Sequence, residues 1–397
     1  MKLTKKKFPW KLIIIFCIPI IIISFLFTNL TSSAADITGI DFIGEAIIPN
    51  GTNFQNTPIG GLSGITYDAK NQLYYAISDD RSEKAPARFY TLKIDLSKGS
   101  LQENGAVPVG VTLLLNEKNE NFAPSTIDSE GIALTNRGTV FISSEGDAAK
   151  LINPFIKEFS LASGKEINDL PIPNNFLPSA GGKQGIRNNL ALESLTITPD
   201  QKHLFSATEN ALIQDGTESK PGVSTRCRIL QYNLATNQLE KEYLYQTEAV
   251  KPSFNITGKY AQGLPDLHAL DNQGHFLSME RSFTGIGFAI SLFQVSLEGA
   301  TDIRNIDSLL TANTTIKPVQ KKLLLDLRKL NVSLDNIEGL TIGGKLPDGQ
   351  SSLILVSDNN FQSIQRTQFL AFKLKTQSLL QRLLQRLLPG RDKPTVE

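Results

Sequence analysis

The sequence predicts an all-β fold, a β-propeller of about five four-stranded blades. A short motif recurs five times along the chain, and two further strand-like runs follow each copy in a constant order. Polar turns separate these runs. A sheet of four short strands cannot bury both faces alone, and radial packing around a channel solves that problem. A sandwich or a two-domain arrangement is the alternative.

The first element of each unit is an apolar strand whose second residue is small or acidic. The copies cover residues 62–67, 129–134, 192–197, 265–270 and 337–342. Aligning positions 63, 130, 193, 266 and 338 gives steps of 67, 63, 73 and 72 residues. Spacing this regular is the signature of a repeat architecture.

The second and third elements also read as strands, because apolar residues alternate between turn-forming residues. The second runs, each ending in an acid, cover 73–79, 140–145, 204–209, 276–280 and 353–358. The third runs cover 89–94, 156–161, 229–234, 292–297 and 369–374. Candidate fourth strands lie at 111–115, 167–172, 243–246 and 323–327. Each unit therefore predicts four antiparallel strands.

The two ends of the repeat predict how the ring closes. The fifth unit ends at Leu374 without a fourth strand, whereas residues 37–48 form a strand-like segment before the first unit. We expect this segment to complete the last blade, so that the propeller domain covers residues 36–375. The long insert at about 299–320 leaves room for part of a sixth blade.

Both termini depart from the repeat. Lysines precede an apolar run over 12–27, and small residues including Ser33 and Ala35 follow it, which is the order of a secretory leader. Residues 1–35 are therefore a signal peptide or an uncleaved signal anchor, and the rest is extracytoplasmic. Residues 376–397 predict a short amphipathic helix. Membrane contact is expected only through these segments, and the oligomeric state stays open.

Composition excludes several classes of function. Lys and Arg number 40 against 39 Asp and Glu, a net charge of +1, so no basic field exists to bind nucleic acid. Only Cys17, Cys227 and three His are present, which excludes a disulfide scaffold and a Cys/His zinc site. No phosphate-binding glycine loop is found, and Ser63 lacks the spacing of a hydrolase nucleophile. A metal here needs oxygen ligands.

Acidic residues open the first strands and close the second ones, and these positions meet at one end of an antiparallel hairpin. We therefore expect a ring of carboxylates at one mouth of the channel. A dense set of oxygen anions is typical of a Ca²⁺ site. The expected metal ligands are Asp79, Asp80, Glu130, Glu145, Asp147, Glu193, Glu209, Asp266, Glu280, Glu338 and Asp358.

Arginines fall at the same end of the strands. Arg81, Arg88 and Arg281 are expected to bind phosphate oxygens, since a guanidinium matches phosphate geometry. Either Glu130 or Glu193 is the expected general base. The alternative for each acid is a structural cap at a turn. His268 lies two residues after Asp266 and is either a proton shuttle or a core histidine.

The chain resembles the secreted bacterial family called phytase-like, or esterase-like activity of phytase. The motifs that carry the resemblance include Gly61-Leu-Ser-Gly-Ile-Thr-Tyr-Asp68, Ile77-Ser-Asp-Asp-Arg81, Asp128-Ser-Glu-Gly131, Asn336-Ile-Glu-Gly339 and Ser357-Asp-Asn359. The resemblance implies an extracytoplasmic propeller with phosphoester-hydrolysing activity. We therefore expect an exported, calcium-dependent phosphoesterase that acts on a phosphorylated or acidic small molecule. The alternative is a noncatalytic propeller that binds an acidic ligand or a protein partner.

Overall fold

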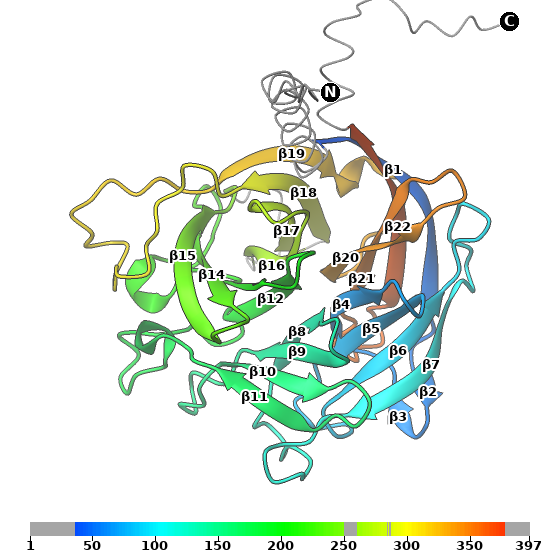
Figure 1. Ribbon diagram of the computed structural model, residues 1–397, viewed down its shortest axis with the longest axis horizontal. Coiled ribbons are helices and arrows are strands. Elements are labelled where there is room, and N and C mark those ends of the chain that lie inside the picture. The colour runs from blue at the N-terminus through cyan, green and yellow to red at the C-terminus, as the bar shows by residue number, and fades with distance from the viewer. Residues whose placement is uncertain (1–35, 250–259, 284, 286, 378–397) are drawn as a thin grey trace, which may run out of the picture. The chain divides into compact units, whose positions relative to one another are not determined.

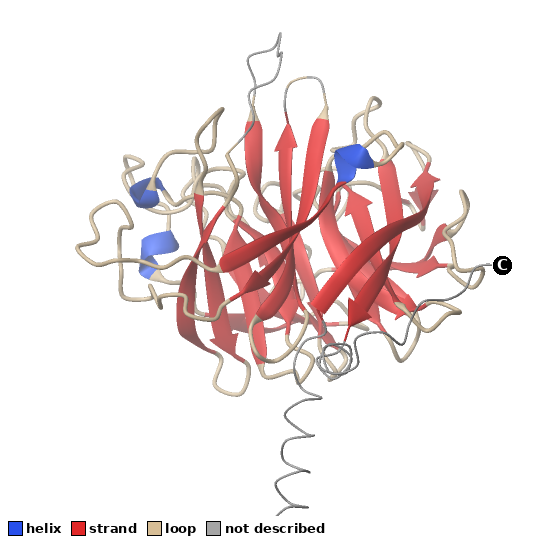
Figure 2. Cartoon of the chain, turned by 90° about the horizontal axis from the view of Figure 1, so that it is seen from above, coloured by secondary structure: helices blue, strands red, loops and turns tan. Residues whose placement is uncertain are grey.

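Five four-stranded antiparallel sheets surround a central channel in the computed structural model (Figure 1). The structure describes residues 36–249, 260–283, 285 and 287–377. Seen from the side, the strands run between two faces, and the loops and short 3-10 helices lie at the ends and the rim (Figure 2). The sequence prediction of a propeller is confirmed.

The first three blades follow the chain order. Blade one holds β4 (Leu62–Asp68), β5 (Leu73–Ser78), β6 (Arg88–Ile94) and β7 (Ala106–Leu113). Blade two holds β8 (Ser129–Leu134), β9 (Thr139–Ser144), β10 (Phe155–Ser160) and β11 (Glu166–Leu170). Blade three holds β12 (Leu192–Ile197), β13 (His203–Thr208), β14 (Arg226–Asn233) and β15 (Gln238–Gln246).

The last two blades differ in how they are completed. Blade four holds β16 (Ala261–Ala269), β17 (His275–Phe283), β18 (Phe288–Ser296) and β19 (Gln320–Asp326). Blade five holds β20 (Ile337–Lys345), β21 (Ser351–Ser357), β22 (Thr367–Gln377) and, as its outer strand, β1 (Asp36–Ile48). The expected closure of the ring by the N-terminal strand is confirmed.

Minor elements lie in the connections. They are the pair β2 (Asn53–Phe54) and β3 (Thr57–Pro58), and the 3-10 helices η1 (Asn174–Phe176), η2 (Ile213–Asp215) and η3 (Leu327–Lys329). Within the described ranges, no helix is long and apolar enough to cross a membrane. The expected leader (1–35) and most of the expected C-terminal helix fall outside the described residues.

No sixth blade forms in the part of the chain that the structure describes, and the insert has another role. Its residues Ile303 and Leu309 pack with Leu244 of β15 into a small apolar cluster. The backbone N–H of Ile303 donates to Glu242 O at 2.9 Å. The insert therefore covers the outer strand of blade three, because an edge strand carries unpaired backbone groups that need a cover.

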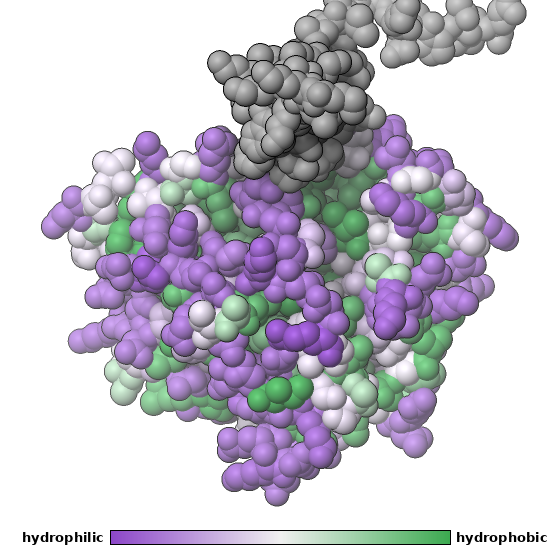
Figure 3. Space-filling view, in the orientation of Figure 1, coloured by the Kyte–Doolittle hydropathy of each residue, from purple (hydrophilic) through white to green (hydrophobic). Residues whose placement is uncertain are grey.

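The core lies between neighbouring blades. One cluster joins Tyr75, Ile77 and Phe89 of blade one to Val140 and Phe159 of blade two, all buried. Similar clusters span the contacts of blades five and one, two and three, and three and four. Burying such surface contributes about 25 cal/mol per Å² of apolar area, so each blade is stabilised mainly by its neighbours. Hydrophilic residues dominate the face seen down the channel, with hydrophobic patches between them (Figure 3).

The inner strands β4, β8, β12, β16 and β20 contact one another around the channel. They approach closely at small residues. A Cβ added at Gly64 would lie 2.5 Å from Glu130 O, and one at Gly131 would lie 2.7 Å from Glu193 O. No side chain fits at these distances. The glycine that follows the repeated acid is therefore what lets the next inner strand pack against it.

Candidate functional site

A β-bulge lies where each inner strand begins. In blade three, Leu192 pairs with Thr208 and Ser194 with Ala207, so Glu193 is the extra residue. Glu338 is the extra residue of blade five by the same pattern, and Glu130 lies inside the bulge of blade two. A bulge re-aims a side chain and often lies beside a functional site. These bulges place the three glutamates at one mouth of the channel.

Two groups of three carboxylates form at this mouth. Asp79, Asp128 and Glu130 each offer an oxygen, and these oxygens lie within 4.8 Å of one another. Glu145 and Glu193 form a second such group with Glu130. Carboxylate oxygens within this span match the ligand set of a hard divalent cation.

Glu209, Glu338 and Asp358 extend the group beside Arg281. The Nη2 of Arg281 lies 2.7 Å from an oxygen of Glu209, and its Nη1 contacts Glu338 and donates to Asn336 Oδ1 at 2.7 Å. We call the eight acids together the acidic mouth. Its members are Asp79, Asp128, Glu130, Glu145, Glu193, Glu209, Glu338 and Asp358.

The acidic mouth holds far more negative than positive charge. Besides Arg281, Arg81 is the one guanidinium of the described residues that hydrogen-bonds these acids, donating from Nε to Asp128 Oδ1 at 2.7 Å, and its Nη2 donates to Asn189 Oδ1 at 2.9 Å. With every carboxylate ionised, eight negative charges meet two guanidiniums and leave a charge of −6.

Burial raises the pKa of several acids at this mouth. Desolvation, followed by repulsion from neighbouring carboxylates, holds the pKa of Asp79, Glu130 and Glu193 well above the ordinary range. The pKa of Glu145 and Asp358 is raised for the same reasons. In the absence of added cations, these groups retain protons at a pH where an exposed carboxyl is ionised.

The oxygen atoms fit a calcium ion. Oδ1 of Asp79 is buried and accepts no hydrogen bond within the described residues. Glu130 is 6% exposed, and its carboxylate has neither a hydrogen-bond donor nor an ion-pair partner there. Buried charges are normally paired or bind metals. The donors are all oxygens, as Ca²⁺ prefers.

Several sequence-predicted residues lie apart from this group. Arg88 is fully buried, contacts Asp80, and donates to Tyr90 Oη at 2.7 Å and Pro58 O at 2.9 Å. Its bond to Pro58 connects the β2–β3 pair to β6 of blade one. Asp147 pairs with Lys150 at 2.9 Å on the rim.

Blade four also uses its acids differently. Asp266 accepts backbone N–H groups of Leu267 at 2.8 Å and Leu340 at 2.7 Å, so it joins inner strands β16 and β20. Glu280 accepts from Tyr245 Oη at 2.9 Å and contacts Lys321 Nζ at 2.6 Å. The bulge of β16 falls between Gly263 and Asp266, before the repeated acid, so its side chain points elsewhere.

Three polar residues of the site were missing from the expected ligands: Asp128, Asn189 and Asn336. Asp128 and Asn336 stand two residues before Glu130 and Glu338 within the family-like motifs. Residues two apart on a strand face the same side, so a polar residue at this offset was the available signal. Asn189 lies in a loop, and no pattern marked it.

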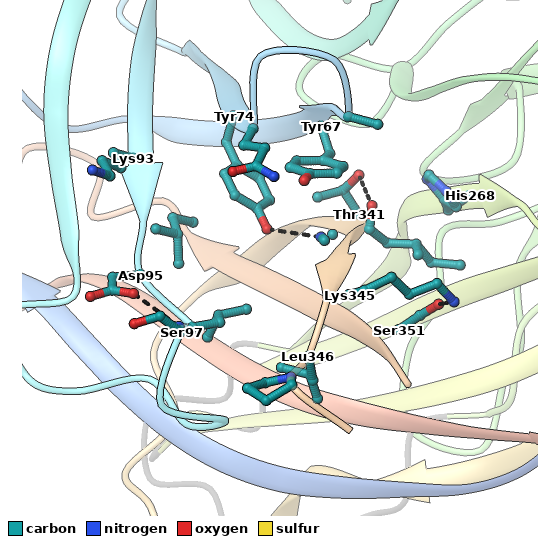
Figure 4. A pocket seen from close by; sticks show the side chains of 18 of the residues that line it. Tyr67, Tyr74, Lys93, Asp95, Ser97, His268, Thr341, Lys345, Leu346 and Ser351 are labelled. Atoms are coloured by element: carbon teal, nitrogen blue, oxygen red, sulfur yellow. Dashed lines mark hydrogen bonds between the residues drawn. The ribbon is translucent and has the colours of Figure 1, made fainter. Parts of the chain in front are cut away.

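A cavity lies at the opposite mouth of the channel. Its volume is about 1100 Å³, and its lining includes Tyr67, Tyr74, His268 and Lys345 (Figure 4). These residues come from the ends of inner strands and their hairpins, whereas the acidic mouth comes from the strand starts. The two tyrosine rings lie 4.7 Å apart. Burial lowers the pKa of His268 to about 4, so this ring is neutral.

The sequence also matches known proteins. The family model "Phytase-like: Esterase-like activity of phytase" matches residues 57–361. An uncharacterized secreted protein of Arthroderma benhamiae is 26% identical over 144 residues, 30% of this chain. The match spans 27% of that protein's length.

Solved structures resemble the chain weakly. An endo-arabinase from Bacteroides thetaiotaomicron gives a TM-score of 0.41 at 11% identity, covering 83% of this chain and 97% of that chain. The periplasmic gluconolactonase of Pseudomonas aeruginosa gives 0.36 at 10% identity, covering 86% and 96%. The calcium-binding protein regucalcin from Agrobacterium tumefaciens gives 0.36 at 12% identity, covering 83% and 94%.

Proposed function

The chain belongs to the phytase-like family, and on this premise we propose that it is an exported calcium-dependent phosphoesterase that acts at the acidic mouth. One observation carries the proposal: within the described residues, eight carboxylates, seven of them buried, face two guanidiniums. Such a group needs further positive charge. A divalent cation supplies it and attracts the phosphate of a substrate.

The residues that would hold calcium are Asp79, Asp128, Glu130 and Glu145, from the two carboxylate groups around Glu130. Bound there, calcium supplies a positive charge that neutralises the nonbridging phosphate oxygens as the phosphorus–oxygen bond breaks. Arg81 remains partly exposed, and its Nη1 makes no hydrogen bond within the described residues, so we assign this group to a phosphate oxygen. Arg281 is a positioning residue, because its contacts go to Glu209, Glu338 and Asn336.

Glu193 is the proposed general base. Glu130 belongs to both carboxylate groups and is therefore assigned to metal binding, whereas Glu193 belongs to one. Its raised pKa makes it a better proton acceptor near neutral pH than an ordinary glutamate. Glu193 would take a proton from the attacking water while the leaving oxygen departs from phosphorus.

Export is part of the same proposal. The expected leader supports it, and the relative from Arthroderma benhamiae is named as secreted. Millimolar calcium outside the cytoplasm suits the weaker class of protein calcium sites.

Hydrolysis of p-nitrophenyl phosphate and phytate by the exported protein, with calcium or with chelator, tests the activity. We expect turnover that disappears with chelator and in Glu193→Gln. Asp95→Asn, an acid-to-amide change at the opposite mouth, is the matched control and should retain turnover. Calcium binding without any turnover would contradict the enzyme and support the noncatalytic alternative.

A further inference from the structure

We propose that the acidic mouth binds two divalent cations and that Glu130 is a ligand shared by both. The inference rests on the proposed function only in placing cations at this mouth. The number of cations and the bridging role of Glu130 are argued separately, from the arrangement of the carboxylates.

The first argument is geometric. Glu130 belongs to two groups: Asp79 and Asp128 complete one, and Glu145 and Glu193 complete the other, each group with oxygens within 4.8 Å of one another. The two sets otherwise share no residue. Asp79 and Asp128 precede or follow strands of blades one and two, whereas Glu145 and Glu193 come from blades two and three. Two adjacent positions are therefore built from three consecutive blades.

The second argument is the state of Glu130 itself. Its side chain is 6% exposed and lies in the bulge at the start of β8. Desolvation and four neighbouring carboxylates act on it, and its carboxylate makes no hydrogen bond or ion pair within the described residues, although the charge of Arg81 acts on it from farther away. Two of the other acids have direct partners: Asp128 has Arg81, and Glu145 accepts the backbone N–H of Ala191. A buried carboxylate left without a partner between two ligand sets fits one that bridges two cations.

The third argument is charge. When all groups are ionised, eight carboxylates and two guanidiniums give the acidic mouth a net charge of −6. One bound divalent cation would reduce this net charge to −4, and two would reduce it to −2. The arginines lie at the two ends: Arg81 pairs with Asp128, and Arg281 pairs with Glu209 and Glu338. The carboxylates around Glu130 lie between them and depend on bound cations. Pairs of metal ions sharing a site occur in phosphatases and nucleases.

Calorimetric titration of the exported protein with calcium chloride tests the proposal. We expect two calcium ions per chain in the wild type and one each in Asp79→Asn and Glu145→Gln. Glu130→Gln should weaken both affinities by at least about tenfold, since loss of even an outer-shell partner costs that much. Asp95→Asn should retain two ions. One ion in the wild type, or loss of only one in Glu130→Gln, overturns the proposal.

Energy transfer from terbium to europium supplies a test that needs no variant. Both lanthanides occupy calcium sites, and transfer between them requires neighbouring positions in the same molecule. We expect transfer in the wild type and none in Asp79→Asn, whose circular dichroism spectrum checks folding. Absence of transfer in the wild type, with both ions bound, overturns the shared ligand even if Glu130→Gln fails to fold.

The outcomes separate this inference from the proposed function. Binding of two ions without hydrolysis would support the two-cation site and contradict the phosphoesterase activity. Hydrolysis with one bound ion would support the phosphoesterase activity and contradict the two-cation site. Absence of any calcium binding would overturn the pair and the calcium dependence together.

Discussion

The two mouths of the channel are built from the same five strands, yet they differ in chemistry. The acidic mouth holds two overlapping groups of carboxylates, whereas the opposite mouth holds a cavity of about 1100 Å³ with Tyr67 and Tyr74 beside a neutral His268. What separates the mouths is the bulge at the starts of β8, β12 and β20, which lies at Glu130, Glu193 and Glu338. Among the described ends of the inner strands, that of β20 has a register shift between Ile342 and Lys345, and the two residues within it are Gly343 and Gly344, which carry no acid.

The largest difference is expected in catalysis. Glu193→Gln removes the proposed base, and a general base contributes about 10²–10⁴-fold to rate. His268→Gln also replaces a titratable side chain with an amide, but at the opposite mouth, and should leave turnover unchanged. Initial rates on p-nitrophenyl phosphate at saturating calcium measure both. Equal losses in the two variants would contradict the separation of the mouths.

Calcium should stabilise the protein through one mouth only. A ligand at about 100 times its dissociation constant that binds only the folded state adds about 2.7 kcal/mol. We expect the unfolding midpoint to rise by about 5 °C or more in calcium relative to chelator. The rise should be much smaller in Glu130→Gln and intact in His268→Gln. If calcium raised the unfolding midpoint of Glu130→Gln as much as that of the wild type, the calcium site would not include Glu130.

In chelator, the acidic mouth should make stability fall as pH rises. Asp79, Glu130 and Glu193 have a raised pKa in the folded state, so the folded protein binds protons more tightly than the unfolded chain. Their stabilising contribution is complete below the unfolded pKa of about 4 and is lost as pH rises through the raised values. Urea unfolding from pH 4.5 to 8 measures the slope. Saturating calcium should flatten it, and a slope unaffected by calcium would contradict the assignment.

The opposite mouth should give a smaller pH effect of opposite sign. The pKa of His268 falls to about 4 on burial, so the unfolded chain binds this proton more readily than the folded protein. Its contribution is complete above the unfolded pKa of about 6.5 and is lost as pH falls toward 4. His268→Gln should therefore lose less stability than the wild type between pH 7 and 4. An identical loss in both proteins would show that His268 is solvated.

Much of this arrangement could be predicted from the sequence, because a fixed repeat sets both strand order and the end at which each acid lies. The repeat identified Glu130, Glu193 and Glu338, and it identified the N-terminal strand that closes the ring. It could not separate Asp266 from these acids, since the bulge of β16 falls before that residue and no residue pattern marks the shift. Arg88 and Glu280 were beyond prediction because burial decides their role. Arg88 is enclosed with Asp80 and Tyr90, whereas Glu280 meets Tyr245 and Lys321 from distant segments.

Ring closure has a consequence for how the protein acquires its site. The outer strand of blade five is the first strand of the chain, and Gln368 Nε2 donates to Glu45 Oε2 at 2.8 Å across 323 positions of sequence. Pairings of such long range form slowly, because the chain must close a large loop first. Glu338 and Asp358 belong to this blade. An emerging or shortened chain therefore carries an acidic mouth without Glu338 and Asp358, and the carboxylates around Glu130, which come from blades one to three, are the first part of the site to assemble.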